Sequence, residues 1–347
     1  MRQHGLSGRL LVWQPVFIAA ALLLAVLAAG EFRIGGLSAR DTTQTFIWVA
    51  LVCGMYVYTG VTGIVTFGHL GFSAIGAYVV AILAINPLFK QSALTGLPAF
   101  ILTNAMSPWI AVCIAAGVVL VVAIPIGLAI GRLKNEALSI GTFAFLLVLY
   151  AAFSNWDQVT GGTTALVGVP LVVGKWSALL LAVATIVAAR AFRMSSWGIM
   201  LAAARDDEVA AASCGVNVGA LRFVAFVAAA VLMGIAGAFQ TLAIGVISVD
   251  TFYIGATSFA LAMLVIGGRN SLSGAVVGTL LISLATTYLS KLEQGFALGG
   301  VRLAIPGGVQ EIIVGILMLA VLIQKPLGIV GYREFYLRRP KDFVQSS

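Results

Sequence analysis

The sequence predicts an all-α membrane protein, built from about ten helices that cross or half-cross the bilayer. Hydrophobic residues make up 61% of the chain and charged residues only 9%, whereas about 25% of the residues of a soluble domain are charged. No charged side chain lies between Asp41 and Lys90, between Lys90 and Arg132, or between Arg222 and Asp250. Since a spanning helix needs about 20 mostly apolar residues, each of these runs has room for at least one span.

Ten apolar stretches qualify as spans when hydropathy is averaged over a window of about 19 residues. Several are short or interrupted by glycine, so we expect some of them to be half-helices or re-entrant segments. The glycine-rich segments after Val61 and after Phe252 suggest a possible pseudo-repeat of two halves. The ten predicted spans are 11–30, 44–66, 68–86, 109–130, 137–154, 176–192, 221–245, 254–268, 271–290 and 308–324.

The first stretch has a second interpretation. Arg2 and Arg9 precede an apolar run that ends in the small residues Ala28, Ala29 and Gly30, and this order is also typical of a cleaved signal peptide. The run is longer than the apolar core of about 7–15 residues that signal peptides use. A retained spanning helix is therefore the favoured interpretation.

Small residues recur inside the predicted spans. Two GxxxG pairs, at 127/131 and 274/278, are joined by close glycine spacings at 60/63 and 234/237. Glycine lets helix backbones approach closely where lipid removes the hydrophobic drive for helices to associate. For each of these glycines, tight packing of helices without a part in transport is the favoured interpretation.

The placement of basic residues predicts the topology. Ten spans put both termini on one side of the membrane, and cytoplasmic loops are enriched in Lys and Arg. With the N-terminus in the cytoplasm, 14 of the 20 Lys and Arg residues are cytoplasmic, which explains the net charge of +8 without nucleic acid as a partner. The other six lie outside: Arg33, Arg40, Lys90, Lys175, Lys291 and Arg302.

Nothing in the sequence indicates an enzyme. The two histidines, His4 and His69, are too few for a metal site, the GxxxxGK[ST] nucleotide motif is absent, and the three cysteines are expected to serve packing. Carriers driven by protons or sodium place ionisable groups inside the bilayer, but the predicted spans are nearly free of such groups, with Glu311 near the start of the last span as an exception by position. We therefore expect the energy source to lie outside this chain, which should hold no cofactor.

One short stretch, "WGIMLAAARDDEVAAASCGVNV" (197–218), falls on the cytoplasmic side. Asp206, Asp207 and Glu208 suit the first turn of a helix, where the dipole favours negative charge, and Gly215 suits the position just past its end. A helix of about ten residues with an alanine surface cannot span a membrane, and small side chains permit close docking against another protein. From these residues alone, an ordinary loop helix is an equal alternative.

The same stretch resembles the cytoplasmic segment of ATP-binding-cassette importer permeases of the branched-chain amino acid family, in particular the LivM-like type. Three further stretches resemble that family in the same order: "FGHLGFSAIGAYVVAIL" (67–83), "NWDQVTGGTTALVGVP" (155–170) and "VIGGRNSLSGAVVGTLL" (265–281). The resemblance covers roughly residues 44–325. The chain departs from the pattern at Arg269–Asn270, which replaces a small pair, at Ala275, which replaces proline, and at 165–167.

The resemblance implies an importer permease fold that forms a single transmembrane domain over 1–347. It implies a cytoplasmic coupling segment at 195–220 and a cytoplasmic basic tail at 325–347. The implied partners are a LivH-like sister permease, two cytoplasmic ATPases that hold ATP and Mg²⁺, and an extracytoplasmic substrate-binding protein. The implied location is the inner membrane of a bacterium or archaeon, and the implied cargo is leucine, isoleucine or valine, with urea or short amides as the alternative.

Three groups of residues are candidate sites. The four residues His69, Phe72, Gly76 and Tyr78 are candidates for the translocation path, with a buried histidine bonded to a carbonyl as the alternative for His69. The outer residues Asp157, Thr160, Gly161 and Gly162 are candidates for contact with the binding protein, with a plain structured turn as the alternative. A gradient-driven secondary transporter and a structural scaffold are the competing classes. Residues expected to couple to the ATPase are Asp206, Asp207, Glu208, Ala211, Ala212 and Gly215.

Overall fold

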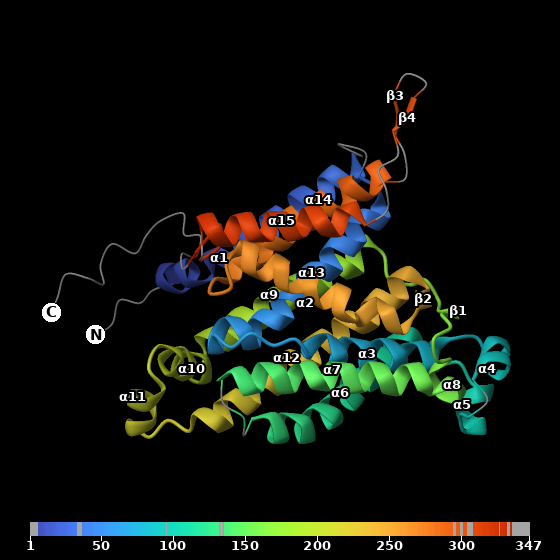
Figure 1. Ribbon diagram of the computed structural model, residues 1–347, viewed down its shortest axis with the longest axis horizontal. Coiled ribbons are helices and arrows are strands. Elements are labelled where there is room, and N and C mark those ends of the chain that lie inside the picture. The colour runs from blue at the N-terminus through green and yellow to red at the C-terminus, as the bar shows by residue number, and fades with distance from the viewer. Residues whose placement is uncertain are drawn as a thin grey trace.

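A computed structural model of the protein describes residues 6–32, 37–94, 96–131, 133, 135–293, 296–298, 301–303, 308–325, 327–331 and 334. These residues form helices almost throughout, which confirms the predicted fold class (Figure 1). Every predicted span coincides with a helix. The ten helices concerned are α1 (Leu6–Glu31), α2 (Ala39–Thr62), α3 (His69–Ala84), α6 (Pro108–Ile130), α7 (Asn135–Asn155), α9 (Lys175–Met194), α12 (Val218–Ile244), α13 (Ile254–Gly267), α14 (Leu272–Glu293) and α15 (Val309–Gln324).

Among the described residues, eight helices are long and apolar enough to cross a membrane. The two shorter ones are α3, with 16 residues, and the apolar part of α15, which covers Ile312–Gln324. A helix of 16 residues is about 24 Å long, less than the hydrocarbon thickness of about 30 Å. The expectation that some predicted spans cross only part of the bilayer therefore fits these two helices by length.

Short elements connect the long helices. They are α4 (Pro87–Ala93), α5 (Ala99–Thr103), α8 (Asp157–Thr160), α10 (Ser196–Asp206), α11 (Glu208–Ser213) and the 3₁₀ helix at Val249–Phe252. The antiparallel strands β1 (Leu166–Val167) and β2 (Val246–Ile247) pair with each other, as do β3 (Phe296–Leu298) and β4 (Val301–Leu303). None of these elements is implied by hydropathy, because none is long enough to cross the bilayer.

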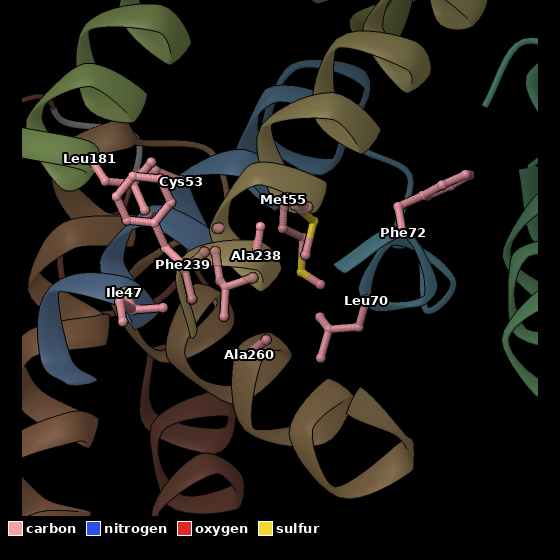
Figure 2. Packing of buried hydrophobic residues seen from close by; sticks show 14 of the residues in the cluster. Ile47, Cys53, Met55, Leu70, Phe72, Leu181, Ala238, Phe239 and Ala260 are labelled. Atoms are coloured by element: carbon pink, nitrogen blue, oxygen red, sulfur yellow. The ribbon is translucent and has the colours of Figure 1, made fainter. Parts of the chain in front are cut away.

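Helix α2 lies at the centre of the fold. In its apolar window 94% of the residues are buried by the chain's own helices, chiefly α9, α12 and α14. Figure 2 shows Ile47, Cys53 and Met55 of α2 packed among side chains of α3, α9, α12 and α13. Cys53 thus has the packing role expected of it, whereas Cys113 and Cys214 are exposed.

Two helix crossings depend on glycine. A Cβ atom on Gly76 of α3 would lie 2.1 Å from the carbonyl oxygen of Gly234 on α12, and one on Gly267 of α13 would lie 1.9 Å from that of Gly274 on α14. Real Cβ atoms do not approach carbonyl oxygens this closely, so only glycine permits these backbone contacts. The packing interpretation of the 234/237 and 274/278 pairs is confirmed, since Gly237 and Gly278 make equally close approaches.

The bundle has two distinct ends. At one end, which we call the arginine end, lie α10 and α11 (Figure 1). Five arginines gather there: Arg190, Arg193, Arg205, Arg222 and Arg269. At the opposite end, Lys175 at the start of α9 pairs with Glu31 at the end of α1, and Lys291 at the end of α14 pairs with Asp41 at the start of α2. Helix α1 begins at the arginine end, where Glu334 also lies. The first and last described parts of the chain therefore lie at one end of the bundle (Figure 1), and the side of the membrane that this end faces stays a prediction.

Candidate functional site

The segment 195–220 is built from two short helices. We predicted one helix over 206–215, but α10 ends at Asp206 and α11 begins at Glu208. The break lies at Asp207, which has extended φ and ψ angles of −151° and 106° and accepts a hydrogen bond from the amide of Ala210 at 2.9 Å. An N-cap residue must leave the helical conformation in order to bond the first turn of the next helix. Asp207 therefore starts α11, and the chain turns there.

The end of α11 is fixed by Gly215, as the sequence predicts. Its φ of 84° lies in the left-handed region, which costs glycine little. The amide of Val216 donates to the carbonyl of Ala211, and the amide of Gly215 donates to that of Ala212. This pair of bonds is the Schellman motif, which satisfies the last carbonyls of a helix. Both ends of α11 are thus specified by its own sequence.

Two arginines attach the segment to the long helices. Arg222 of α12 donates to both carboxylate oxygens of Glu208, at 2.9 and 3.2 Å, and its side chain is only 9% exposed. Arg205 donates to the carbonyl of Gly60 in the last turn of α2 at 3.3 Å, and its alkyl stem lies against Gly63. The positive charge faces the negative end of the α2 dipole. The segment is therefore attached to both α2 and α12.

The segment has an inner and an outer face. Ala204, Ala211 and Val218 are buried together and hold α10, α11 and the start of α12 against one another. Val209 is 77% exposed, and Ala212 is exposed beside it. Among the predicted coupling residues, Ala211 therefore shapes the segment, while Ala212 belongs to the surface that another protein could contact.

A polar cavity of about 600 Å³ lies between this segment and the ends of the long helices. It brings together three arginines (Arg205, Arg222 and Arg269) and two acids (Asp206 and Glu208), and so carries one excess positive charge. The remaining lining residues are Thr62, Gly63, Ile64, Val65, Ser139, Ala204 and Asn270. The segment therefore lies over a polar cavity and is attached to the bundle at the edges of that cavity.

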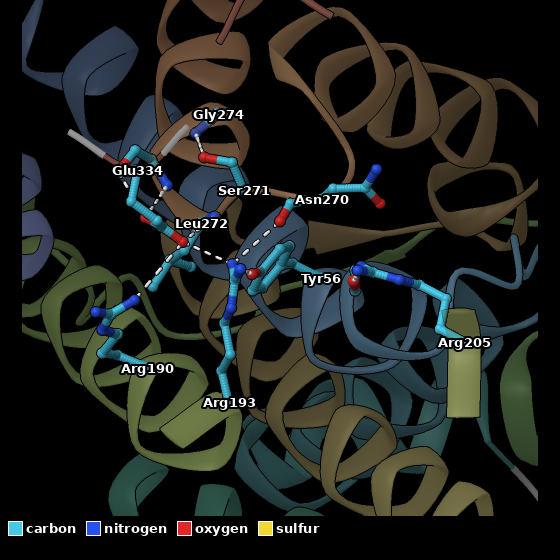
Figure 3. A network of polar contacts seen from close by, with 11 residues as sticks. Tyr56, Arg190, Arg193, Arg205, Asn270, Ser271, Leu272, Gly274 and Glu334 are labelled. Carbon is cyan, nitrogen blue, oxygen red and sulfur yellow. Dashed lines mark hydrogen bonds and ion pairs between the residues drawn. The ribbon is translucent and has the colours of Figure 1, made fainter. Parts of the chain in front are cut away.

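A buried carboxylate lies close to this cavity (Figure 3). Glu334, in the C-terminal tail, accepts hydrogen bonds from the amides of Leu272 and Ser273 at 3.2 and 3.4 Å, which are the first amides of α14. It also pairs with Arg193 at 2.6 Å and lies 3.6 Å from Arg190, both in the last turns of α9. An anion at a helix N-terminus is favoured by the dipole and by the free amides. The tail thus joins α9 to α14.

Sequence reasoning did not find Glu334. The tail was predicted as a basic stretch that fixes topology, and residues 335–347 lie outside the described residues. Glu334 is one of two acids in that stretch, and its hydrogen-bond partners lie 61 to 141 positions earlier in the chain. Asn270, where the chain departs from the family pattern, belongs to the same network because its carbonyl accepts from Arg193.

The predicted path residues are buried in the helix packing. His69, Phe72 and Tyr78 are at most 2% exposed, and Gly76 lies at the crossing of α3 with α12. The Nδ1 atom of His69 lies 2.6 Å from the hydroxyl of Thr66, and its ring packs against Tyr58 and Phe226. His69 is therefore a buried histidine, as the alternative held, with the hydroxyl of Thr66 as the partner of Nδ1 and the backbone of Phe226 as a second hydrogen-bonding group beside the ring. A part in the path stays a prediction for these four residues.

The predicted outer residues form a structured turn at the opposite end. Gly161 and Gly162 have φ angles of 75° and 59°, and the hydroxyl of Thr160 donates to the carbonyls of Phe153 and Trp156. Asp157 is exposed. A contact with a binding protein stays a prediction here. No group of three or more His, Cys, Asp or Glu side chains that could hold a metal ion occurs in the part of the chain that the structure describes.

Known proteins resemble this chain along most of its length. A family model for the permease component of branched-chain amino acid transport systems matches residues 39–322. The high-affinity branched-chain amino acid transport system permease protein LivM of Salmonella typhimurium is 26% identical over 317 residues, covering 82% of this chain and 70% of that protein. The LivM protein of Escherichia coli K12 shows the same identity and coverage. No solved structure gives a significant match.

Proposed function

We propose, from the premise that this chain belongs to the family of permease components of branched-chain amino acid transport systems, that it is the membrane subunit of an ATP-driven importer of leucine, isoleucine and valine. The chain is a multi-pass membrane protein, and a permease subunit of this class is not itself catalytic. The energy must then come from ATPase subunits, which would hold ATP and Mg²⁺. The other partners that we propose are a sister permease and an extracytoplasmic substrate-binding protein.

The observation that carries the proposal is the attachment of the segment 195–220 to the long helices. Its outer face offers Val209 and Ala212 to a partner, while its inner face is fastened to α12 through Glu208 and Arg222. A short helix with both ends capped moves as a rigid unit. A partner that binds the outer face can therefore displace α12 and, through Arg205, the end of α2.

The mechanism that follows is alternating access. Closure of two ATPases upon ATP would push the segment toward the bundle and tilt the helices that it holds. The Glu334 network joins α9 to α14 at the same end of the bundle, so these two helices would move as one body. We propose that the arginine end faces the cytoplasm of a bacterial or archaeal cell, because the basic residues gather there.

Two alternatives concern the cargo and the energy source. The departures from the family pattern at Ala275 and at 165–167 leave urea or a short amide as the second choice of cargo. A gradient-driven carrier is disfavoured because the described spans hold almost no ionisable side chains in their middle. A structural scaffold would move no solute at all.

Uptake by reconstituted vesicles tests the proposal. The permease pair, the ATPases and the binding protein are placed in liposomes, and entry of labelled leucine and urea is measured with ATP and with ion gradients collapsed. We expect leucine to enter only when ATP is hydrolysed. Entry driven by a gradient without ATP would show a secondary transporter, entry of urea alone would show the other cargo, and no entry under any condition would reject the transport function.

A further inference from the structure

A second polar cavity, of about 330 Å³, lies at the opposite end of the bundle between α2, α14 and α15. One face of α2 contributes side chains at positions 41, 44 and 48, and one face of α14 contributes them at 283, 286, 287, 290 and 291. These spacings of three and four residues place each set on a single helix face. The cavity therefore runs about 10 Å down the two helices, at a rise of 1.5 Å per residue.

The mouth of this cavity holds two opposite charges. The Nζ atom of Lys291 lies 3.0 Å from the Oδ2 atom of Asp41, and the two side chains are 36% and 24% exposed. The same ammonium lies 5.8 Å from the centre of the Tyr288 ring. Asp41 also accepts from the amide of Ser38. Each charge thus serves as the counter-ion of the other, and both remain accessible to water.

The interior offers hydroxyl groups and one aromatic wall. The hydroxyl of Thr287 donates to a carbonyl of its own helix, so its oxygen lone pairs remain able to accept a hydrogen bond. The hydroxyl of Ser290 lies within hydrogen-bond distance of the carbonyl of Thr286 and, at 2.6 Å, of the Oε1 atom of Gln310 on α15. The hydrogen bond of 2.9 Å between Thr45 and Ser283 closes the floor. Trp48 is the one aromatic residue among the lining residues. Polar stripes on membrane helices are costly, and they mark functional sites by default.

We propose that this cavity binds a zwitterion that carries an ammonium and an acidic group a few bonds apart. Such a ligand fits between Asp41 and Lys291 and replaces one ion pair with two, so no charge is left without a counter-ion. A simple cation or anion would engage only one member of the pair. The α-amino acid that the proposed function requires has this chemistry, and so does the headgroup of phosphatidylethanolamine.

The inference rests on the proposed function for its choice of amino acid but not for the existence of the site. Cargo released by a binding protein would first bind this chain in the cavity. The apolar side chain of leucine, isoleucine or valine would lie against Trp48, while the charged end remains at the mouth.

Thiol labelling of a Ser290→Cys variant tests the site. The exposed natural thiols are removed by Cys113→Ser and Cys214→Ser, and Cys53 is buried. The rate of reaction with a membrane-impermeant reagent is measured in right-side-out and inverted vesicles without binding protein. At a ligand concentration of about ten times Kd the rate should fall roughly tenfold, because only empty sites react. We expect such protection by leucine, and none by 4-methylpentanoate or isopentylamine, which each lack one charge.

The two sources of the zwitterion are distinguished by the lipid. If phosphatidylethanolamine is the occupant, labelling slows as its content in the vesicles rises and leucine has no effect. If an amino acid is the occupant, leucine protects equally in vesicles of phosphatidylcholine. Protection found only from the inner side of the membrane would retain the site and contradict the orientation given under the proposed function. Equal protection by all three probe molecules, or by none of them in either lipid, would overturn the inference.

A matched pair of double variants separates binding from folding. Asp41→Asn with Lys291→Gln neutralises the cavity pair without leaving an unpaired charge, and should abolish protection while the protein still assembles. Glu31→Gln with Lys175→Gln neutralises another ion pair at the same end of the bundle, outside the cavity, and should leave protection unchanged. Retained protection in the first double variant would contradict the site, whether or not the reconstituted importer moves leucine.

Discussion

The ion pair between Glu208 and Arg222 should decide whether motion of the segment reaches α12. Removing one partner of a fully buried pair costs about 3–5 kcal/mol, whereas an exposed pair is worth only about 0.2–1 kcal/mol. Arg222 is 9% exposed and Glu208 is 41% exposed, so the loss should lie between these limits, at about 2 kcal/mol. Since 1.4 kcal/mol is a factor of ten, the attached state of the segment should become roughly 30-fold less favoured.

The two single variants should differ. Glu208→Gln leaves a nearly buried guanidinium without a carboxylate, while Arg222→Gln leaves a half-exposed carboxylate that water can solvate. We therefore expect leucine uptake per ATP hydrolysed to fall more in Glu208→Gln than in Arg222→Gln, and the double variant to be less impaired than the sum of the two.

Uptake and ATP hydrolysis are measured in the same reconstituted vesicles, with Lys175→Gln as the control for loss of an exposed pair at the other end. Strictly additive effects, or single variants within about twofold of the parent, would refute the reasoning, because residues that act through one contact show interaction energies of about 0.5–3 kcal/mol.

Three further variants test the packing. Glu334→Ala removes the acceptor of two α14 amides and the partner of two arginines, and with them the contacts that join α9 to α14. Thermal unfolding in detergent should therefore begin at a lower temperature. An unchanged melting curve would contradict that role. Gly267→Ala should prevent folding or lower the melting temperature strongly because its Cβ has no room, whereas Gly117→Ala, with open space around it, should be neutral. Lys90 is buried and donates to three carbonyls, and burial lowers the pKa of its ammonium from the ordinary 10.5. The unfolded chain then binds more protons than the folded one in alkaline solution, so stability should rise as pH approaches 10.5, and Lys90→Met should remove that rise.

Hydropathy was sufficient to locate the ten long helices, since a bilayer forces each span to be continuously apolar. It could not locate the break at Asp207, because one aspartate can either lie in the first turn of a helix or cap the next one, and the two differ by only about 1 kcal/mol. The predicted placement of Gly215 was correct because a left-handed cap is a local requirement.

Contacts between distant residues were not accessible to sequence reasoning. Glu334 is one acid in a basic tail, and nothing local indicates that it binds the amides of α14. The cavity at Asp41 and Lys291 did leave a signal, because Ser283, Thr287 and Ser290 recur at helical spacing inside an apolar span. That signal would have shown a polar stripe, although not the helix that faces it.

Labelling of the natural Cys214 tests the coupling role of the segment most directly. This thiol is exposed at the end of α11, and Cys113→Ser leaves it as the one exposed cysteine of the chain. We expect an impermeant maleimide to react with Cys214 in inverted vesicles only, and to react more slowly once the ATPase subunits are added. Labelling of Cys214 in right-side-out vesicles, or a labelling rate that the ATPase subunits leave unchanged, would mean that no ATPase subunit binds this segment.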